Sequence, residues 1–309
     1  MSTPIVDPMK IRSKMRVDEI VNEFNHAGVF NAGRIADAVT IFDEMLKSDA
    51  CKFLGLSGAL VPAGLGCMIA NMITDGLVDV LVTTGANIVH DVINALGQGH
   101  KKGSIHADDT RLREEGISRI YDVYLECEAF MAFERFVHQF FDTLDDGRYP
   151  VSRLLWLLGE HVAPGSGSIL RAAYESDVPV FMPAFSDSML GLHAWICTQE
   201  RDILIDSVAD IGKIVALTSD NRSHGALILG GGVPKNFILQ SMLISPSGGF
   251  DYGIQITMDR PETGGLSGAT LDEAKSWAKM REGAKTVTVY SDVTIALPII
   301  LAAVYSLQG

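Results

Sequence analysis

The sequence predicts an α/β fold in which a buried parallel sheet is flanked by helices. Hydrophobic residues make up 47% of the 309 residues and charged residues 20%, so the chain has enough apolar material for a sizeable core. Short apolar runs that end in glycine or small polar residues alternate with segments of helical periodicity. Such runs are typical of strands that are buried on both faces and joined by crossover helices. The predicted strands lie at 52–56, 78–83, 178–182, 226–229 and 286–290.

Apolar spacing predicts helices between and before these strands. Within 35–46, apolar residues recur every three to four positions, which indicates an amphipathic helix after a polar arm, the two together filling residues 1–50. Phenylalanines at helical spacing within 130–141 indicate a helix packed on the core. Residues 97–116 predict a polar loop. Because no repeat or low-complexity linker divides the chain, we expect a single domain over 1–309.

Composition argues against several classes of function. Asp and Glu number 38 against 25 Lys and Arg, a net charge of -13, and phosphate recognition needs a clustered basic excess. We therefore expect no nucleic-acid partner. The four cysteines are scattered without a C-x-x-C pair, which indicates reduced thiols. The eight histidines show no metal-ligand spacing with carboxylates, so we expect no metal.

The N-terminus has no apolar core of the signal-peptide type, so we expect no export and a cytoplasmic location. Two stretches carry no charge, 53–74 and 293–309. Glycine, proline and asparagine interrupt the first, and the second is short and contains Pro298. Both are interpreted as core and not as membrane spans, and no membrane partner is expected.

Glycine-rich turns follow two of the predicted strands, where ligands bind in parallel sheets. Gly230, Gly231 and Gly232 precede a helix near Pro234, so their N–H groups suit a phosphate, while a tight left-handed turn explains them equally well. The segment 82–87, VTTGAN, joins another strand to a helix, and its hydroxyls suit either a ribose or a helix cap. The full G-x-G-x-x-G pattern is absent, so dinucleotide binding rests on arrangement alone.

One lysine near the C-terminal end is a candidate nucleophile. Thr270 and Glu273 form a capping box, which predicts a helix that reaches Lys279 beside Trp277. A desolvated lysine loses affinity for its proton, and the neutral amine attacks a carbon–nitrogen double bond. From the residues alone, a surface lysine on an amphipathic helix is the favoured interpretation.

Several segments together resemble the deoxyhypusine synthase family. They are FLGLSGALVPAG, VDVLVTTGAN, VPVFMPAFSDSMLG, LILGGGVPKN, LDEAKSWAK and VTVYSD, and they occur in order from about residue 30 to the C-terminus. The resemblance implies a Rossmann-like sheet, NAD as cofactor and a homotetramer with sites at dimer interfaces. It is also what raises Lys279 above the surface interpretation.

The resemblance implies an NAD-dependent transfer of an aminobutyl group from spermidine. In the family, NAD takes hydride from the carbon beside the secondary amine, and the imine is captured by the lysine that corresponds to Lys279. 1,3-Diaminopropane leaves, an acceptor amine displaces the lysine, and the hydride returns. The acceptor is either a protein lysine or a small amine, and a homospermidine synthase-type transfer belongs to the second case.

By the same match, the catalytic role falls on Lys279. The polyamine would be held by Glu273, Trp277, Asn236 and His193. The NAD-contacting segments contain Ser57, Gly58, Thr83, Thr84, Gly85, Asp187, Gly231, Thr257 and Asp292.

The chain also departs from the family's pattern. Leu192 and Leu266 stand where typical members place acids that grip the polyamine, and Asn236 stands in place of a histidine. Val89 and His90 replace a pair of glutamates. Each lost charged hydrogen bond weakens the grip on the amine by about 1.5 to 3 kcal/mol. Two alternatives therefore stay open, a non-catalytic nucleotide-binding subunit and an NAD-dependent amine dehydrogenase.

Overall fold

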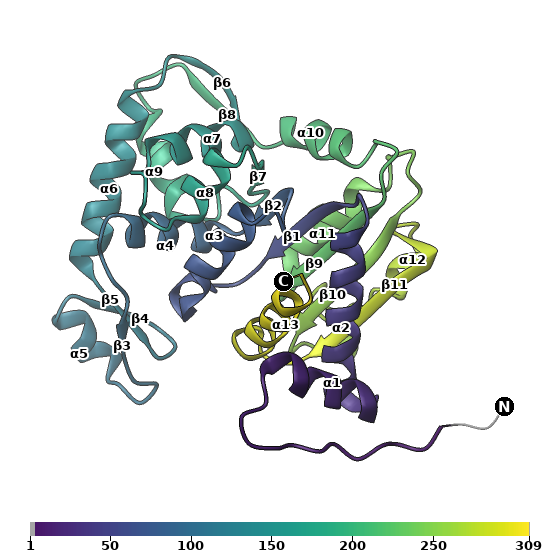
Figure 1. Ribbon diagram of the computed structural model, residues 1–309. Helices are drawn as coiled ribbons and strands as arrows, with labels where there is room; N and C mark the ends of the chain where they lie inside the picture. The colour runs from purple at the N-terminus through teal and green to yellow at the C-terminus, as the bar shows by residue number, and fades with distance from the viewer. Residues whose placement is uncertain (1–3, 309) are drawn as a thin grey trace. The chain divides into compact units, whose positions relative to one another are not determined.

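The computed structural model describes residues 4–308 and divides the chain into two compact units (Figure 1). Unit 1 comprises Met1–Gly55 and Ile214–Gly309, and unit 2 comprises Leu56–Lys213. The boundary at which unit 2 ends and unit 1 resumes, between Lys213 and Ile214, falls within helix α10 (Ala209–Leu217). Unit 1 is thus assembled from both ends of the chain. The single domain over 1–309 stays a prediction.

Unit 1 is built on neighbouring strands in the order β11-β10-β9-β1. Strand β10 pairs in parallel with both β9 and β11, and buried Ile254 at its centre lies opposite Leu227 on one side and Val287 on the other. Strand β10 is therefore a core strand, whereas β11 lies at the end of the strand order and is only partly buried. Their bounds are β1 (Cys51–Leu56), β9 (His224–Leu229), β10 (Phe250–Thr257) and β11 (Met280–Tyr290).

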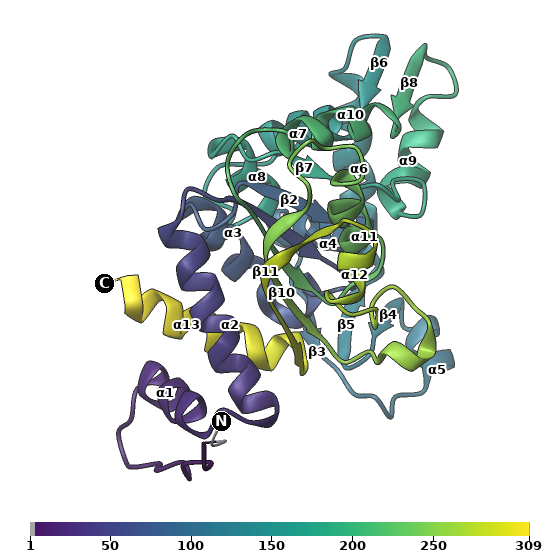
Figure 2. The ribbon, with the colours of Figure 1, turned by 90° about the vertical axis from the view of Figure 1, so that its right-hand side faces the viewer.

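Helices cover both faces of the unit 1 strands. Figure 2 shows α2 and α13 on one side of β10 and β11, and α11 on the other. The predicted amphipathic helix corresponds to α2, whose buried Ala38, Val39 and Phe42 face the core. The helices are α1 (Val17–Ala27), α2 (Phe30–Lys47), α11 (Gly232–Ser241), the short η2 (Pro261–Thr263), α12 (Glu273–Ser276) and α13 (Val293–Gln308).

Unit 2 combines a parallel strand pair with a layer of helices. Strands β2 (Val80–Thr83) and β7 (Val180–Phe181) pair in parallel. The helical segments are η1 (Val61–Leu65), α3 (Gly66–Thr74), α4 (Gly85–Ala95), α6 (Cys127–Asp142), α7 (Val151–His161), α8 (Ile169–Glu175) and α9 (Met189–Cys197). The phenylalanine-rich segment forms α6 and buries Phe133, Phe140 and Phe141, as predicted.

Smaller sheets complete unit 2. Strands β3 (Lys101–Lys102), β5 (Val123–Glu126) and β4 (Ile117–Ile120) form an antiparallel sheet, and β6 (Gly147–Pro150) pairs in parallel with β8 (Ile203–Asp206). Helix α5 (Asp109–Glu114) is capped by Asp108, which accepts hydrogen bonds from Thr110 N and Arg111 N. The predicted polar loop at 97–116 is therefore partly structured.

The predicted α/β class, with a parallel sheet flanked by helices, is confirmed. Each predicted strand overlaps an observed one, but β10 was missed because Asp251, Gly253 and Gln255 interrupt its apolar pattern. Gly253 is closely packed, since a Cβ there would lie 2.9 Å from Met280 Cε and 3.1 Å from Leu271 Cδ1, and the ends of these side chains would have to shift to admit it. Among residues 4–308, no helix has the length and apolar character needed to cross a membrane.

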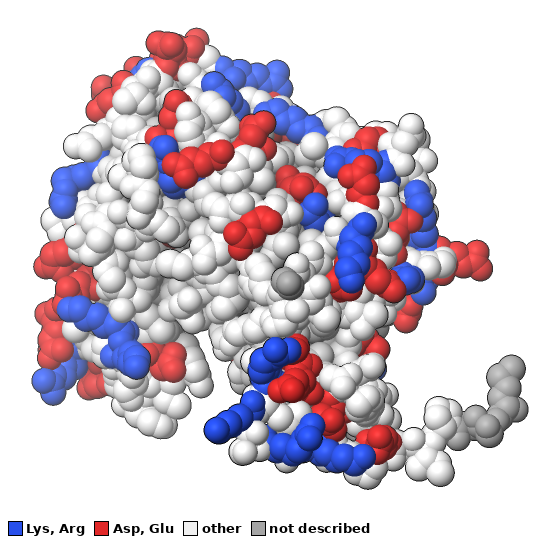
Figure 3. Space-filling model, viewed as in Figure 1, with Lys and Arg blue, Asp and Glu red and all other residues white. Residues whose placement is uncertain are grey.

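Charged side chains of both signs are interspersed over the face drawn in Figure 3. Many form short-range pairs, such as Lys47 with Asp43 at 2.7 Å and Arg171 with Glu175 at 2.6 Å. Pairs of this exposed kind contribute at most about 1 kcal/mol each. The stability of both units therefore comes mainly from their apolar cores.

A buried carboxylate, Asp91 of α4, holds the start of α8. It accepts hydrogen bonds from Ser168 Oγ at 2.6 Å, Ile169 N at 2.8 Å and Leu170 N at 3.1 Å. Burial raises the pKa of Asp91 to about 6, while the three hydrogen bonds oppose that rise. The first N–H groups of α8 have no partner within their own helix, so Asp91 serves as their cap.

Replacing Asp91 by alanine should lower the free energy of unfolding by about 3 kcal/mol, because two buried N–H groups lose their acceptor. Urea unfolding followed by circular dichroism measures the change. Asp145→Ala, which truncates an exposed aspartate in the same unit, should change stability by less than about 0.5 kcal/mol. An equal loss in both variants would contradict a capping role for Asp91.

Candidate active site

A cavity of about 290 Å³ in unit 1 opens beside Lys279. Its wall is mainly apolar, and the charged groups on it are two lysines and one carboxylate. The lining residues are Lys235, Asn236, Leu239, Leu266, Ala269, Thr270, Glu273, Ala274, Trp277 and Lys279. The predicted catalytic lysine therefore shares one cavity with Glu273, Trp277 and Asn236. We call this cavity the lysine pocket.

The backbone places Lys279 in a turn and not on a helix. Helix α12 ends at Ser276, and Ala278 adopts the left-handed conformation with φ 53°. Lys279 N donates to Ala274 O at 3.0 Å, and Lys279 O accepts from Phe250 N at 3.1 Å. The predicted helix through Lys279 is therefore wrong, although Thr270 Oγ1 does accept from Glu273 N at 3.1 Å as the capping box requires.

The ammonium group of Lys279 lies among polar and aromatic neighbours. Its Nζ donates to Asn236 Oδ1 at 3.3 Å and lies 5.8 Å from the centroid of the Trp277 ring. Lys279 is half-buried, whereas Trp277 is 61% exposed and Glu273 is exposed. The lysine is thus held at the inner end of a pocket whose outer wall an amine can reach.

A second lysine, Lys235 of α11, lines the pocket and donates hydrogen bonds to other residues of its wall. It is 3% exposed, and its Nζ donates to Gln255 Oε1 at 2.9 Å, to Leu266 O at 3.0 Å and to Ala269 O. The pKa of Lys235 is lowered to about 8, mainly by burial; Glu273 opposes the shift and the charge of Lys279 adds to it. These bonds anchor the 266–269 segment that lines the pocket.

Sequence reasoning did not select Lys235 as a site residue. The available signal was a single charge within the segment GVPKNFILQS of α11, directly after the glycine turn. A lysine there is ordinarily expected to be exposed. Its burial becomes evident only when β10 is recognised, because Gln255 of that strand supplies one of its acceptors.

The glycine turn after β9 is explained by its backbone. Gly230 and Gly232 have φ of 83° and 55°, which favours glycine. A Cβ on Gly231 would lie 2.4 Å from Ser267 Cα, so this glycine allows the 266–269 segment to approach. Gly232 N donates to Ser267 Oγ at 3.1 Å. The tight-turn interpretation is therefore confirmed, and a phosphate contact at Gly231 stays a prediction.

Two further predicted NAD residues of unit 1 lie at the carboxyl ends of strands: Thr257 is the last residue of β10, and Asp292 follows β11. Thr257 is buried, and its Oγ1 accepts from Asp259 N at 3.1 Å. Asp292 is half-buried, and its Oδ1 accepts from Thr294 N at 2.7 Å at the start of α13. Together with Gly231 they occupy the strand ends where α/β proteins bind ligands.

The predicted NAD residues of unit 2 lie after β1, β2 and β7. Thr84 caps α4 by accepting from Asn87 N and also donates to Gly58 O at 2.9 Å, which confirms the capping interpretation. Buried Thr83 donates to Leu56 O at 3.2 Å. Ser57 is half-buried between these turns.

Two more of these residues differ in their freedom to meet a ligand. A Cβ on Gly85 would lie 2.2 Å from Ser188 Cβ, so the start of α4 has room only for glycine. Asp187 is exposed, and among the residues from 4 to 308 its carboxylate accepts no hydrogen bond. Its carboxylate is therefore available to a hydroxyl group.

The positions of the expected glutamate pair hold no carboxylate. Val89 and His90 are buried in α4, and His90 Nδ1 lies 2.9 Å from His100 Nε2. His100 Nδ1 in turn lies 2.8 Å from Asn94 Oδ1. Burial, with a smaller effect of His100, lowers the pKa of His90 to about 4. These side chains carry no negative charge, so they cannot replace two carboxylates in binding a cationic amine.

His193 lies in unit 2, buried on α9 and facing α6. Its ring is 5.4 Å, between centroids, from that of His138. The ligand atoms of Glu134, His138 and His193 all lie within 4.8 Å of one another. The prediction that histidines do not cluster with carboxylates is therefore wrong, because the fold brings residues distant in sequence together. A substrate contact of His193 stays a prediction.

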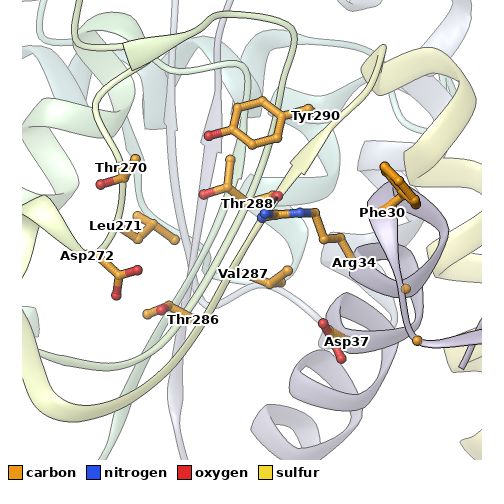
Figure 4. Close-up of a pocket in the computed structure, with 12 residues that line it drawn as sticks. Phe30, Arg34, Asp37, Thr270, Leu271, Asp272, Thr286, Val287, Thr288 and Tyr290 are labelled. Atoms are coloured by element: carbon orange, nitrogen blue, oxygen red, sulfur yellow. Dashed lines mark hydrogen bonds between the residues drawn. The ribbon is translucent and has the colours of Figure 1, made fainter. Parts of the chain in front are cut away.

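A larger cavity of about 480 Å³ lies between α2 and the outer edge of β11 (Figure 4). Arg34 reaches across it, donating from Nη1 to Thr288 O at 2.9 Å and lying 5.4 Å from the Tyr290 ring centroid. Figure 4 shows Arg34 directed toward these residues. Thr270 lines both this cavity and the lysine pocket. Arg34 thus covers part of an edge strand, and none of the predicted site residues lines this cavity.

A family model described as deoxyhypusine synthase matches residues 19–304. The chain belongs to the deoxyhypusine synthase family. It is 51% identical over 306 residues to "Probable deoxyhypusine synthase 1" of Methanosarcina acetivorans, covering 98% of this chain and 95% of the relative. It is 38% identical over 304 residues to "Probable deoxyhypusine synthase" of Methanopyrus kandleri, covering 98% of each. The predicted membership in this family of transferases is confirmed.

Solved structures support the fold. A crystal structure of an Entamoeba histolytica protein named as a deoxyhypusine synthase matches with a TM-score of 0.66 at 16% identity, covering 95% of this chain and 94% of that one. A LOR/SDH protein of Methanococcus maripaludis matches with a TM-score of 0.52 at 12% identity, covering 98% and 71%. At these identities the likeness concerns the fold alone.

Proposed function

We propose that this member of the deoxyhypusine synthase family transfers an aminobutyl group from spermidine to an acceptor amine, with NAD as cofactor. Lys279 would hold the group as an imine in transit. The observation that carries this proposal is the placement of Lys279 Nζ inside the lysine pocket, 5.8 Å from the Trp277 ring centroid and bonded to Asn236. The family membership supports the same chemistry.

Each side chain of the pocket has a distinct task in this proposal. Lys279 attacks as a neutral amine, with Asn236 orienting its Nζ. The exposed face of Trp277 and the carboxylate of Glu273 attract a cationic amine. Leu239, Leu266 and Ala274 exclude water, which protects an imine from hydrolysis.

Each unit, taken by itself, holds residues that suit a part of a dinucleotide. NAD would take up hydride from the carbon beside the secondary amine of spermidine and later return it. The free, exposed carboxylate of Asp187 suits a ribose hydroxyl, and Asp292 offers a second carboxylate. Gly58, where a Cβ would meet nothing within 4 Å, leaves room for a group to approach the backbone. Within unit 1, the N-terminus of α11 favours the negative charge of a pyrophosphate.

The pocket wall carries one carboxylate with which to hold the amine donor. Glu273 is the carboxylate among its lining residues, and Leu266 occupies a place where the family carries an acid. A donor with several charges is therefore held more weakly than in typical members. Transfer to a small amine such as putrescine, giving homospermidine, is the alternative within the same mechanism.

Replacing Leu266 by aspartate should lower the KM for spermidine about tenfold or more, because a charged hydrogen bond contributes about 1.5 to 3 kcal/mol. Leu266 is 48% exposed, so the new carboxylate keeps its hydration. Steady-state release of 1,3-diaminopropane measures the effect. Leu243→Asp, at a similarly exposed leucine outside the pocket, should leave KM unchanged. An unchanged KM in Leu266→Asp would contradict spermidine binding at this wall.

The product assay tests the proposal directly. Incubation with NAD and spermidine, with and without putrescine or an acceptor protein, should release 1,3-diaminopropane and form the aminobutylated product. Lasting accumulation of reduced nicotinamide, without a transferred group, would instead support an amine dehydrogenase. NAD binding without any turnover would support a non-catalytic subunit. A homotetramer with shared sites and a cytoplasmic location stay predictions.

A further inference from the structure

The geometry points to a divalent transition-metal site in unit 2, formed by Glu134, His138 and His193. One ligand atom from each side chain lies within 4.8 Å of the other two. Glu134 and His138 come from α6, and His193 comes from α9, which packs against it. None of the three residues lines the lysine pocket, and only His193 also has a predicted contact with the polyamine.

The spacing of the three residues explains why they converge. Glu134 and His138 are four residues apart on α6, so their side chains project from the same face of the helix. His193 projects from the facing surface of α9, with its ring at 69° to that of His138. Two imidazoles and one carboxylate form a donor set that binds Zn²⁺ with an open fourth position for water.

Unpartnered nitrogen atoms provide an independent reason to expect a ligand. His138 Nε2 and His193 Nδ1 are buried and have no hydrogen-bond partner within residues 4–308. His193 is only 6% exposed. Leaving a buried polar atom unpaired costs about 1 to 3 kcal/mol, so such atoms ordinarily have a partner. A metal ion bound by both rings would provide one for each.

The surroundings suit an ion that enters from solvent. Phe133, which is fully buried, packs its ring 5.9 Å from that of His193 and forms an apolar wall. Glu134 is exposed. Zn²⁺ holds nitrogen and oxygen ligands at about 2.0 to 2.2 Å, so its ligands lie closer together than 4.8 Å. Small side-chain rotations of Glu134 and His138 are therefore part of binding.

Binding would join α6 to α9, and α9 begins two residues after Asp187. An ion that binds only the folded chain stabilises it, and the gain in stability rises with the logarithm of the ion concentration once that concentration exceeds Kd. The site is therefore expected to stabilise unit 2, whether or not the transfer reaction takes place. This separates its test from that of the proposed function.

The test uses the full chain, depleted of metal with a chelator, and titrated with Zn²⁺ or Co²⁺. Calorimetry should show one equivalent bound per chain, and thermal unfolding should shift upward with added Zn²⁺. Co²⁺ should give visible absorption without a thiolate charge-transfer band. Glu134→Gln and His138→Ala should each weaken binding at least about tenfold. Glu134 is exposed, so its variant tests the site with little risk to folding.

Two matched variants serve as controls. Glu128→Gln removes an exposed carboxylate from the same helix, and Cys197→Ser removes a thiol one turn beyond His193. Both should bind Zn²⁺ as the original chain does. Affinity that is unchanged in Glu134→Gln and His138→Ala, or lost in Cys197→Ser, would overturn the proposal. Absence of stoichiometric binding by the original chain would do the same.

Discussion

Replacing Lys279 by alanine should abolish group transfer, lowering kcat at least about a thousandfold. That factor corresponds to about 4 kcal/mol of activation free energy. The loss follows because no other amine in the lysine pocket is free to form the imine. The second pocket lysine, Lys235, is buried and already donates to three oxygen atoms.

Borohydride trapping gives the direct measurement. With NAD and spermidine, reduction of the imine should leave a stable secondary amine on Lys279, detected by peptide mass. Lys279→Arg keeps the positive charge but cannot form an imine, so it should be as inactive as Lys279→Ala. Lys275→Ala, which removes a neighbouring lysine paired with Asp272 outside the pocket, should retain activity and the adduct.

The outcome that would refute the role of Lys279 is an adduct that persists in Lys279→Ala. Absence of an adduct in the original chain, with any of a panel of di- and triamines and despite measurable NAD binding, would favour the non-catalytic alternative. These two results are distinct, because the first moves the imine to another residue and the second removes it.

Replacing Lys235 by methionine should lower the free energy of unfolding by about 2 to 4 kcal/mol. Three oxygen atoms lose their donor, which costs about 1 to 3 kcal/mol for each acceptor left unpaired. Part of this cost is offset because methionine no longer requires a buried ammonium group to be desolvated. Because Leu266 and Ala269 line the lysine pocket, KM for the amine should also rise. Urea unfolding and steady-state kinetics measure the two effects.

The pH dependence of this variant provides a sharper check. The pKa of Lys235 falls from its usual 10.5 in the unfolded chain to about 8 in the folded one. Between these values the unfolded chain binds more protons, so Lys235 makes the folded chain more stable as pH rises from 8 to 10.5. Below pH 8 this contribution is absent. The stability difference between the original chain and Lys235→Met should therefore grow across that range.

Lys275→Met is the control for both measurements. It makes the same substitution at a half-buried lysine whose partner, Asp272, is exposed, and it should change stability by less than about 0.5 kcal/mol. A loss in Lys235→Met no larger than in this control would show that the buried hydrogen bonds do not support the pocket. A pH-independent difference would argue that Lys235 titrates normally in the folded chain.

The sequence was sufficient for the fold class. The resemblance also selected Lys279, Glu273, Trp277 and Asn236, which line one pocket in the structure, while their roles stay predictions. Apolar runs predicted β1, β2, β7, β9 and β11, since strands buried on both faces need continuous hydrophobic residues. Strand β10 was not predicted because it contains the polar residue Gln255. This residue is buried because its Oε1 accepts a hydrogen bond from Lys235, a contact that no local pattern reveals. The same long-range dependence hid the burial of Lys235.

Local backbone geometry accounts for the error at Lys279. A capping box indicates where a helix begins, but α12 ends after one turn, and the left-handed Ala278 redirects the chain. Nothing in the residue types of SWAK requires that conformation. Convergence of Glu134, His138 and His193 was likewise invisible, although the four-residue spacing on α6 was available as a signal.

The assembly of unit 1 from both chain ends affects how the protein is synthesised. Strand β1 lies beside β9, with Cys51 N donating to Ser223 O at 2.9 Å, yet about 170 residues separate the two strands in sequence. At ribosomal rates of about 5 to 20 residues per second, β1 waits roughly 10 to 35 s for its neighbour. Residues 56–213 emerge during that interval and are able to collapse first. Because apolar β1 stays unpaired during that interval, we expect a chaperone to bind the nascent N-terminal segment.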